Sequence, residues 1–160
     1  MRDLINIITE AMEPVVYHST EWGVDIIDDG LIKANTAISP ESLELRAYDL
    51  RDDEKSDWLR GICVTRSFYF ARQFSFTIFA LDLNKIRNRY RMIPRAEKDA
   101  YDLANNHGDF RLEAEEFVVC SGLSVDQYVT KIWLSEEVKD DPEYSVVINH
   151  PRFVGFFRQP

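Results

Sequence analysis

Short apolar segments recur along the chain and are separated by polar residues. Six of these segments are rich in β-branched and aromatic residues and predict strands, at residues 15–18, 61–65, 75–83, 115–120, 128–134 and 144–149. The run through Phe79, Ala80 and Leu81 has no polar alternation, so we expect that strand to be buried on both faces. Strands therefore dominate the predicted fold.

Capping residues and helical spacing predict short helices between the strands. Asp3 begins a helix within residues 1–13, because apolar residues recur at helical spacing after it and Pro14 stops it. Residues 22–29 form a second helix, and Gly30 favours the left-handed conformation that ends a helix.

Two further helices each follow a capping residue at the end of a strand. Ser67 caps an aromatic helix over residues 68–74, and Asp82 caps a helix over residues 83–89. Aromatic side chains bury large apolar areas, so several of them are expected to pack on the core. These are Tyr69, Phe70 and Phe74 in the aromatic helix, and Phe153, Phe156 and Phe157 near the C-terminus.

A polar segment interrupts the pattern at residues 34–59. It contains the run DLRDDEKSD, which has no apolar face, and we interpret the segment as a surface excursion or a lid. No internal repeat or linker divides the chain, which predicts a single domain over residues 1–160. Many short strands with a few short helices predict an α+β fold, with two small packed, mainly antiparallel β-sheets and short flanking helices.

The composition fits such a domain and bears on its location. The chain has 160 residues, of which 45% are hydrophobic and 12% aromatic, enough for a proper core. No stretch approaches the roughly 18 consecutive apolar residues of a membrane span, and the N-terminus lacks the pattern of a signal peptide. We therefore expect a cytoplasmic protein without a membrane segment.

The candidate metal ligands are scattered along the chain. Cys63 and Cys120 lie in apolar strand-like runs, where thiols ordinarily act as small hydrophobic groups. His18, His107 and His150 are far apart in the sequence, and no CxxC pair occurs. No metal site is therefore predicted.

The formal net charge of −9 bears on the choice of partner. Binding to a phosphate backbone needs clustered Lys and Arg side chains, so a nucleic acid is a less favoured partner than a protein. One basic segment, RNRYRMIPR at residues 87–95, departs from this balance. Tyr90 within it could stack on a base.

Three carboxylates precede the apolar part of the strand predicted at residues 115–120. Residues 111–120 read RLEAEEFVVC and contain Glu113, Glu115 and Glu116. Because side chains alternate along a strand, Glu113 and Glu115 share one face while Glu116 points to the other. We therefore expect one of these carboxylates to face the interior. A carboxylate held by a rigid strand beside other negative charges is suited to orient a hydroxyl or to stabilise a developing cation.

Three separate segments resemble, in order, the ADP-ribosyltransferase superfamily, which includes diphtheria-toxin-like enzymes, poly(ADP-ribose) polymerases and RNA 2′-phosphotransferases. They are YHST at residues 17–20 with IIDDGL at residues 26–31, GICVTRSFYFA at residues 61–71, and EAEEFVV at residues 113–119. Each motif is weak, but their ordered combination is more specific. The layout is similar to that of small phage- or bacteria-encoded members.

The resemblance implies an NAD site that begins at the end of the first strand. His18 would hydrogen-bond a ribose hydroxyl of NAD, which a neutral imidazole can do. The backbone at Ser19, beside Thr20, would contact the nicotinamide carboxamide.

The second segment allows two mutually exclusive alignments with the family. In one alignment, Tyr69 matches a tyrosine that stacks on nicotinamide. In the other, Thr65, Arg66 and Ser67 match the Ser-Thr-Ser strand of the arginine-modifying branch. Either alignment adds residues to the NAD site.

The third segment implies the catalytic carboxylate. We prefer Glu116, because EFVV resembles the Glu-Tyr-Ile-Val strand start of the polymerase-like class. Glu115 is the alternative, since Glu113 and Glu115 also fit the Glu-x-Glu pattern of the arginine-modifying class. The reaction needs such a group because cleavage of the bond to nicotinamide creates an oxocarbenium-like ribose.

These observations predict a mono-ADP-ribosyltransferase that transfers ADP-ribose from NAD to a macromolecular acceptor, with a protein favoured as the acceptor. The alternative is a non-catalytic acidic binding or inhibitor protein, a phage or mobile-element effector that retains the fold. Such a protein would use residues 49–57 and 136–143 on a basic partner. An RNA 2′-phosphotransferase has less support, because the basic residues that would hold an internal phosphate are not evident.

Overall fold

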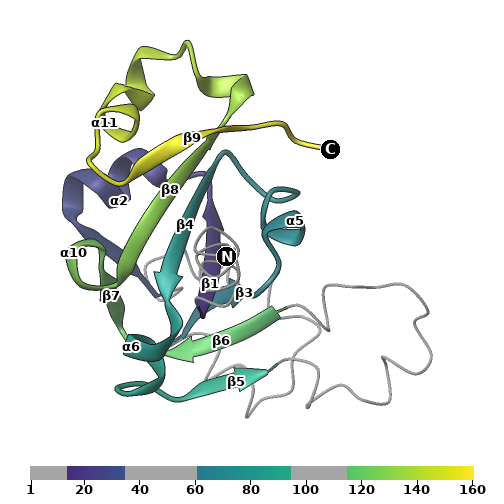
Figure 1. Cartoon of the computed structure of the whole chain (residues 1–160). Helices are drawn as coiled ribbons and strands as arrows, with labels where there is room; N and C mark the ends of the chain where they lie inside the picture. The colour runs from purple at the N-terminus through teal and green to yellow at the C-terminus, as the bar shows by residue number, and fades with distance from the viewer. Residues whose placement is uncertain (1–13, 35–60, 95–114) are drawn as a thin grey trace, which may run out of the picture.

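The computed structural model describes residues 14–34, 61–94 and 115–160 (Figure 1). The helix predicted within residues 1–13, nearly all of the polar segment at 34–59, and Glu113 lie outside these ranges. The strands are β1 Val15–Thr20, β2 Leu31–Lys33, β3 Gly61–Thr65, β4 Thr77–Asp82, β5 Met92–Pro94, β6 Glu115–Val119, β7 Gly122–Ser124, β8 Val129–Ser135 and β9 Phe153–Phe157. The helices are α2 Gly23–Asp29, α5 Phe68–Ala71, α6 Leu83–Arg87, α10 Val125–Tyr128 and α11 Ser145–Ile148, with 3₁₀ turns η2 Glu136–Val138 and η3 Pro142–Tyr144.

Seven of these strands form one sheet in the order β5-β6-β3-β1-β4-β8-β9, and β2 pairs with β7 in a separate two-stranded sheet. Neighbours in the large sheet are antiparallel except β8 and β9, which are parallel. The α+β class with mainly antiparallel strands is therefore confirmed. In place of two small sheets, the structure has one large sheet and one small one.

The large sheet is weakly joined at its centre. Between β1 and β3, a single residue pair, Tyr17 with Thr65, is in register. By contrast, β1 pairs with β4 along its whole length, and β3 pairs with β6 along its whole length. The sheet therefore consists of a three-stranded part and a four-stranded part that meet near Tyr17 and Thr65.

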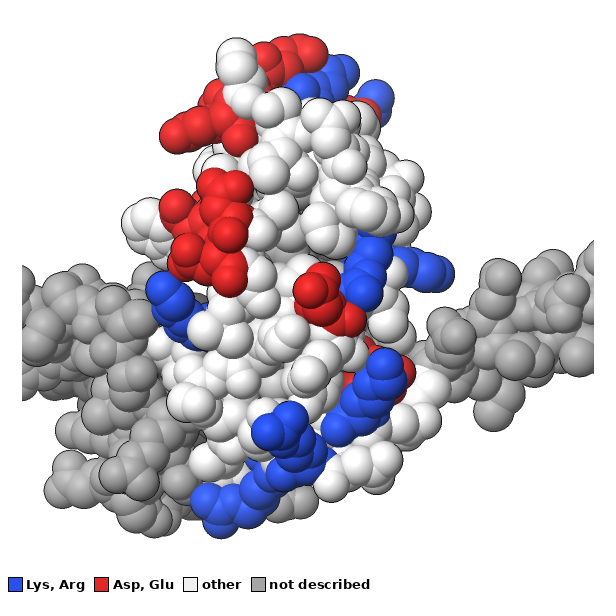
Figure 2. All heavy atoms as spheres, turned by 90° about the vertical axis from the view of Figure 1, so that its left-hand side faces the viewer, with Lys and Arg blue, Asp and Glu red and all other residues white. Residues whose placement is uncertain are grey.

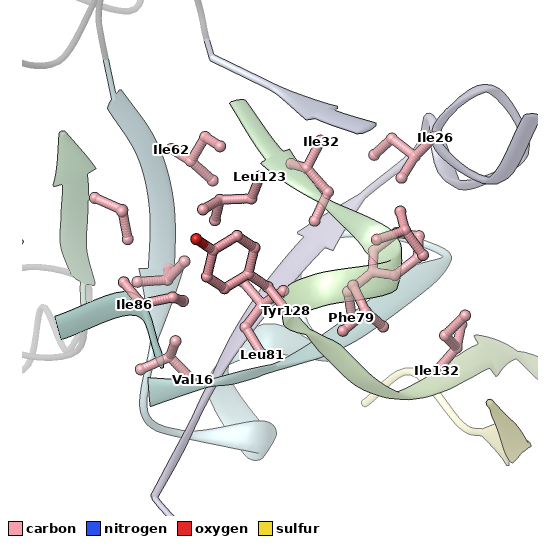
Figure 3. Close-up of a cluster of buried hydrophobic side chains, with 14 of the residues drawn as sticks. Val16, Ile26, Ile32, Ile62, Phe79, Leu81, Ile86, Leu123, Tyr128 and Ile132 are labelled. Carbon is pink, nitrogen blue, oxygen red and sulfur yellow. The ribbon is translucent and has the colours of Figure 1, made fainter. Parts of the chain in front are cut away.

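Side-chain alternation along the central strands divides the core between two faces of the sheet. One face carries the larger apolar cluster, which α2, β2 and β7 help to enclose (Figure 3). On the opposite face, Ile78 packs with Ala71 and Phe157, and with the rings of Tyr17 and Phe68. The strand β4 supplies side chains to both clusters, so its predicted burial on both faces is confirmed.

Several predicted helix ends are confirmed by their capping groups. Gly30 follows α2 with φ 67°, the left-handed conformation in which glycine is favoured. The Ser67 hydroxyl accepts a hydrogen bond from the Phe70 N–H at 3.1 Å at the start of α5. The Asp82 carboxylate does the same for the Lys85 N–H at the start of α6.

The strand predicted over residues 144–149 is wrong, because these residues form α11 after the turn η3. Asp141 caps that turn by accepting from the Glu143 N–H at 3.0 Å, and Pro142 stands in its first turn. Val147 is completely buried, and α11 packs on α2. Burial of one helical face therefore overrides the β-propensity of the valines. The last strand is instead β9.

The aromatic helix is shorter than predicted and packs fewer of its rings. It ends at Ala71, and Phe70 is buried, but Tyr69 is 61% exposed and Phe74 is 54% exposed. At the C-terminus, Phe157 is buried while Phe156 lies on the surface. The expectation that Tyr69, Phe74 and Phe156 belong to the core is therefore wrong.

Candidate active site

The strands β1, β3 and β6 place several of the predicted site residues near one another. Tyr17 pairs with Thr65 across β1 and β3, and Val64 pairs with Glu116 across β3 and β6. Alternation along β1 puts His18 on the face of Val16, and alternation along β6 puts Glu116 on the face of Val118. Both valines belong to the larger apolar cluster, so His18 and Glu116 lie on one face of the sheet, on strands separated by β3.

Glu116 faces inward, at 9% exposure. Arg66 binds it with two bonds: Nε donates to Oε2 at 2.7 Å, and Nη2 donates to Oε1 at 3.0 Å. The hydrogen bond to Glu116 raises the pKa of Arg66 above its ordinary value. The pair is therefore a bidentate, charge-assisted contact, which is among the stronger polar interactions in proteins.

His18 forms a hydrogen bond between Nδ1 and the backbone carbonyl oxygen of Cys63, at 2.8 Å. Burial lowers the pKa of His18 below its ordinary value, and the bond to Cys63 opposes this shift. The ring is therefore neutral near neutral pH. Since a carbonyl oxygen only accepts, the single ring proton lies on Nδ1, and Nε2 keeps a lone pair that can accept a hydrogen bond.

The predicted hydroxyl groups of the site bind the backbone of nearby turns. Thr20 Oγ1 accepts from the Trp22 N–H at 3.0 Å, and Thr65 Oγ1 accepts from the Ser67 N–H at 3.1 Å. The Ser67 hydroxyl caps α5 as described above. These three side chains therefore hold the chain at the ends of β1 and β3.

Ser19 alternates with His18 along β1, so its side chain points to the opposite face of the sheet. Its backbone pairs with Ile78 of β4. Its hydroxyl oxygen is buried and has no hydrogen-bond partner in the part of the chain that the structure describes. The structure thus places Ser19 next to His18 in sequence but on the face that α5 covers.

Tyr69 lies on α5, which packs through Phe68 and Ala71 on the face opposite His18. The Arg72 guanidinium stands over the Tyr69 ring, 4.8 Å from its centroid. Among the described residues, no hydrogen bond or ring contact joins Tyr69 to His18 or to Glu116. Tyr69 is therefore an exposed ring of the helix that covers the opposite face from His18 and Glu116.

The other two carboxylates of the predicted site are less defined. The backbone of Glu115 pairs with Thr65 at the first position of β6, and Glu113 lies outside the described residues. Glu116 is the catalytic candidate whose surroundings the structure describes.

Sequence reasoning placed Arg66 in the site but missed its ion pair with Glu116. The available signal was an arginine directly after the strand at 61–65, together with a glutamate at the start of the strand at 115–120. Only the antiparallel pairing of β3 with β6 shows that the two are neighbours. The bond from His18 to the Cys63 carbonyl has no sequence signal, because it depends on how β1 and β3 meet.

Cys120 takes no part in this site. Its side chain is buried in the larger apolar cluster, and burial raises the pKa of its thiol to about 11. The thiol is therefore protonated at neutral pH and acts as a small hydrophobic group, which is a poor nucleophile.

Residues 14–34, 61–94 and 115–160 contain no group of three or more His, Cys, Asp or Glu side chains that could hold a metal ion. In the same ranges, no helix is long and apolar enough to cross a membrane. Comparisons of the chain with protein-family models, with curated proteins and with solved structures found no match.

Proposed function

We propose that the protein is a mono-ADP-ribosyltransferase that transfers ADP-ribose from NAD to a macromolecular acceptor. The observation that supports this most directly is that His18 and Glu116 lie on one face of the sheet, on strands separated by β3. In the proposed complex, NAD would place a ribose between the two side chains. The resemblance of three ordered segments to ADP-ribosyltransferases supports the same activity.

Glu116 would stabilise the reacting ribose. When the bond between C1′ and the nicotinamide nitrogen breaks, the electron pair leaves with nicotinamide and positive charge develops on the ribose. A carboxylate that accepts a hydrogen bond from a ribose hydroxyl stabilises this charge. The acceptor then forms a bond to C1′ and loses its proton to the solvent.

The ion pair with Arg66 is compatible with this role. A carboxylate has about four acceptor positions, and the two bonds from Arg66 use one position on each oxygen. One further position per oxygen remains for a ribose hydroxyl.

His18 would bind a second ribose hydroxyl. Its Nδ1–H is held by the Cys63 carbonyl, so the ring orientation is set before NAD arrives. Because the ring is neutral, Nε2 accepts a hydrogen bond and adds no positive charge beside the developing cation.

The surface charges support a protein as the acceptor. Figure 2 shows most of the acidic side chains in the upper half of one face, with basic side chains at its top, at its sides and at its lower end. Tyr90, which could have stacked on a base, instead packs against the Tyr128 ring and lies under the Arg89 guanidinium. A nucleic-acid acceptor therefore has less support than a protein with a basic surface.

The test is nicotinamide release and label transfer from NAD, with the Glu116→Gln variant in parallel. We expect the wild-type protein to label an acceptor in a bacterial lysate, and Glu116→Gln to lower nicotinamide release by about 100-fold or more. Glu136→Gln is the matched control, because Glu136 forms an ion pair with Arg158 at 2.9 Å on the exposed surface. No release from the wild-type protein, or equal release from Glu116→Gln, would refute the proposal.

A second candidate is a non-catalytic binding protein with an acidic surface. Three carboxylates near Tyr144 support it: burial and the charges of Asp141, Glu143 and Glu21 raise the pKa of this tyrosine. These three carboxylates therefore converge around one tyrosine. Capture of a basic partner that is lost in Asp141→Asn/Glu143→Gln but kept in Glu116→Gln would favour this candidate.

A further inference from the structure

We propose that Arg66 is a positioning residue for Glu116 rather than a contact for NAD, an inference that rests on the proposed function. The guanidinium is planar and donates two parallel bonds to the two oxygens of Glu116, at 2.7 and 3.0 Å. Two such bonds set the plane of the carboxylate, whereas a single bond would leave it free to rotate. The orientation of the remaining acceptor positions of Glu116 thus depends on Arg66.

The backbone on both sides of Arg66 is held in place. Thr65 Oγ1 accepts from the Ser67 N–H, which closes the turn around Arg66. Ser67 Oγ in turn accepts from the Phe70 N–H, which ties the same turn to the start of α5. Thr65 is also nearly buried, at 5% exposure. The guanidinium therefore extends from a hydrogen-bonded turn, and its two bonds to Glu116 fix the carboxylate relative to that turn.

The assignment changes the roles that the family resemblance implied for residues 65–67. There, Thr65, Arg66 and Ser67 were expected to bind the cofactor. In the structure, the two hydroxyls bind the turn and the guanidinium binds Glu116. The three residues act together on a carboxylate of the neighbouring strand β6.

Steady-state kinetics of nicotinamide release test the assignment, with NAD affinity measured separately by calorimetry. We expect Arg66→Gln to lower kcat by about 100-fold, because a misplaced catalytic group can cost that much, while the Kd for NAD stays within about twofold. Arg66→Lys keeps the charge but not the planar fork, so its kcat should be intermediate.

Arg158→Gln is the matched control, because it removes an arginine from an exposed pair with Glu136. Its kinetics should equal those of the wild-type protein. If Arg66→Gln weakens NAD binding and leaves kcat unchanged, Arg66 is a cofactor contact and the assignment is wrong. If Arg66→Lys matches the wild-type protein, the charge alone acts and the positioning role is also wrong. A wild-type protein that releases no nicotinamide overturns the proposed function itself, which is a different result from either of these.

Discussion

The ion pair between Arg66 and Glu116 predicts a measurable coupling in the free energy of unfolding. Glu116 is buried, with its side chain 11% exposed, whereas the Arg66 side chain is 51% exposed. Removal of one partner from a fully buried pair costs about 3–5 kcal/mol, and an exposed pair contributes about 0–1 kcal/mol. For this intermediate pair we expect Arg66→Gln to cost about 2 kcal/mol, mostly because a buried carboxylate loses its partner.

A double-mutant cycle separates the interaction from the two single effects. The variants are Arg66→Gln, Glu116→Gln and the double substitution, and urea unfolding gives the free energy of each. The double variant leaves no unpaired buried charge, so we expect a coupling energy of about 1–2 kcal/mol. In thermal unfolding, a loss of about 2 kcal/mol corresponds to a Tm lower by about 4–8 °C for a domain of this size.

The pair Arg158 and Glu136 provides the comparison, since its side chains are 85% and 41% exposed. The same cycle on this pair should give a coupling below about 1 kcal/mol. Equal coupling energies in the two cycles would refute the argument from burial. An Arg66→Gln variant within about 0.5 kcal/mol of the wild-type protein would do the same, because it would mean that water solvates the Glu116 carboxylate.

A Cβ on Gly23 would lie 2.7 Å from the Cβ of the buried Thr77, so Gly23→Ala should destabilise the protein in urea unfolding. Overpacking costs about 1–3 kcal/mol, which outweighs the gain in helix propensity of up to about 1 kcal/mol. Gly155→Ala is the control: its Cβ meets open space, so it should change the free energy of unfolding by less than about 0.5 kcal/mol. Burial lowers the pKa of His18 in the folded protein, so the unfolded chain binds more protons than the folded protein at a pH below the ordinary histidine pKa. The free energy of unfolding should therefore fall as the pH drops from about 7 to 5. His18→Gln should flatten this pH dependence relative to the wild-type protein, and His150→Gln, whose pKa is also lowered by burial, should flatten it separately. An unchanged slope in His18→Gln would show that the ring is not buried as described.

Much of the local structure could be predicted because its causes are local. The strand β3 and the cap at Ser67 follow from an apolar β-branched run and a serine that precedes a helix. The end of α2 at Gly30 follows from the conformational freedom of glycine. These features depend on a few consecutive residues, and the sequence displays them directly.

The sequence-based predictions were wrong where contacts between residues distant in the chain determine the structure. Residues 145–148 have strand-forming side chains, but burial of Val147 against α2 makes them a helix. Tyr69 and Phe74 are aromatic, but α5 ends at Ala71 and both rings stay on the surface. Propensity is a weak preference that tertiary packing can reverse.

The candidate site shows the same division. The sequence alone determined which residue types stand at the ends of the strands, including His18, Arg66 and Glu116, and alternation already implied that one carboxylate faces inward. Only the tertiary structure decided that Glu116 faces inward, that Arg66 binds it, and that the His18 ring is oriented by Cys63. The physical reason is that strand order and register bring together groups that lie 45 and 50 residues apart in the chain. Local residue preferences do not encode such pairings, which depend on the packing of the whole sheet.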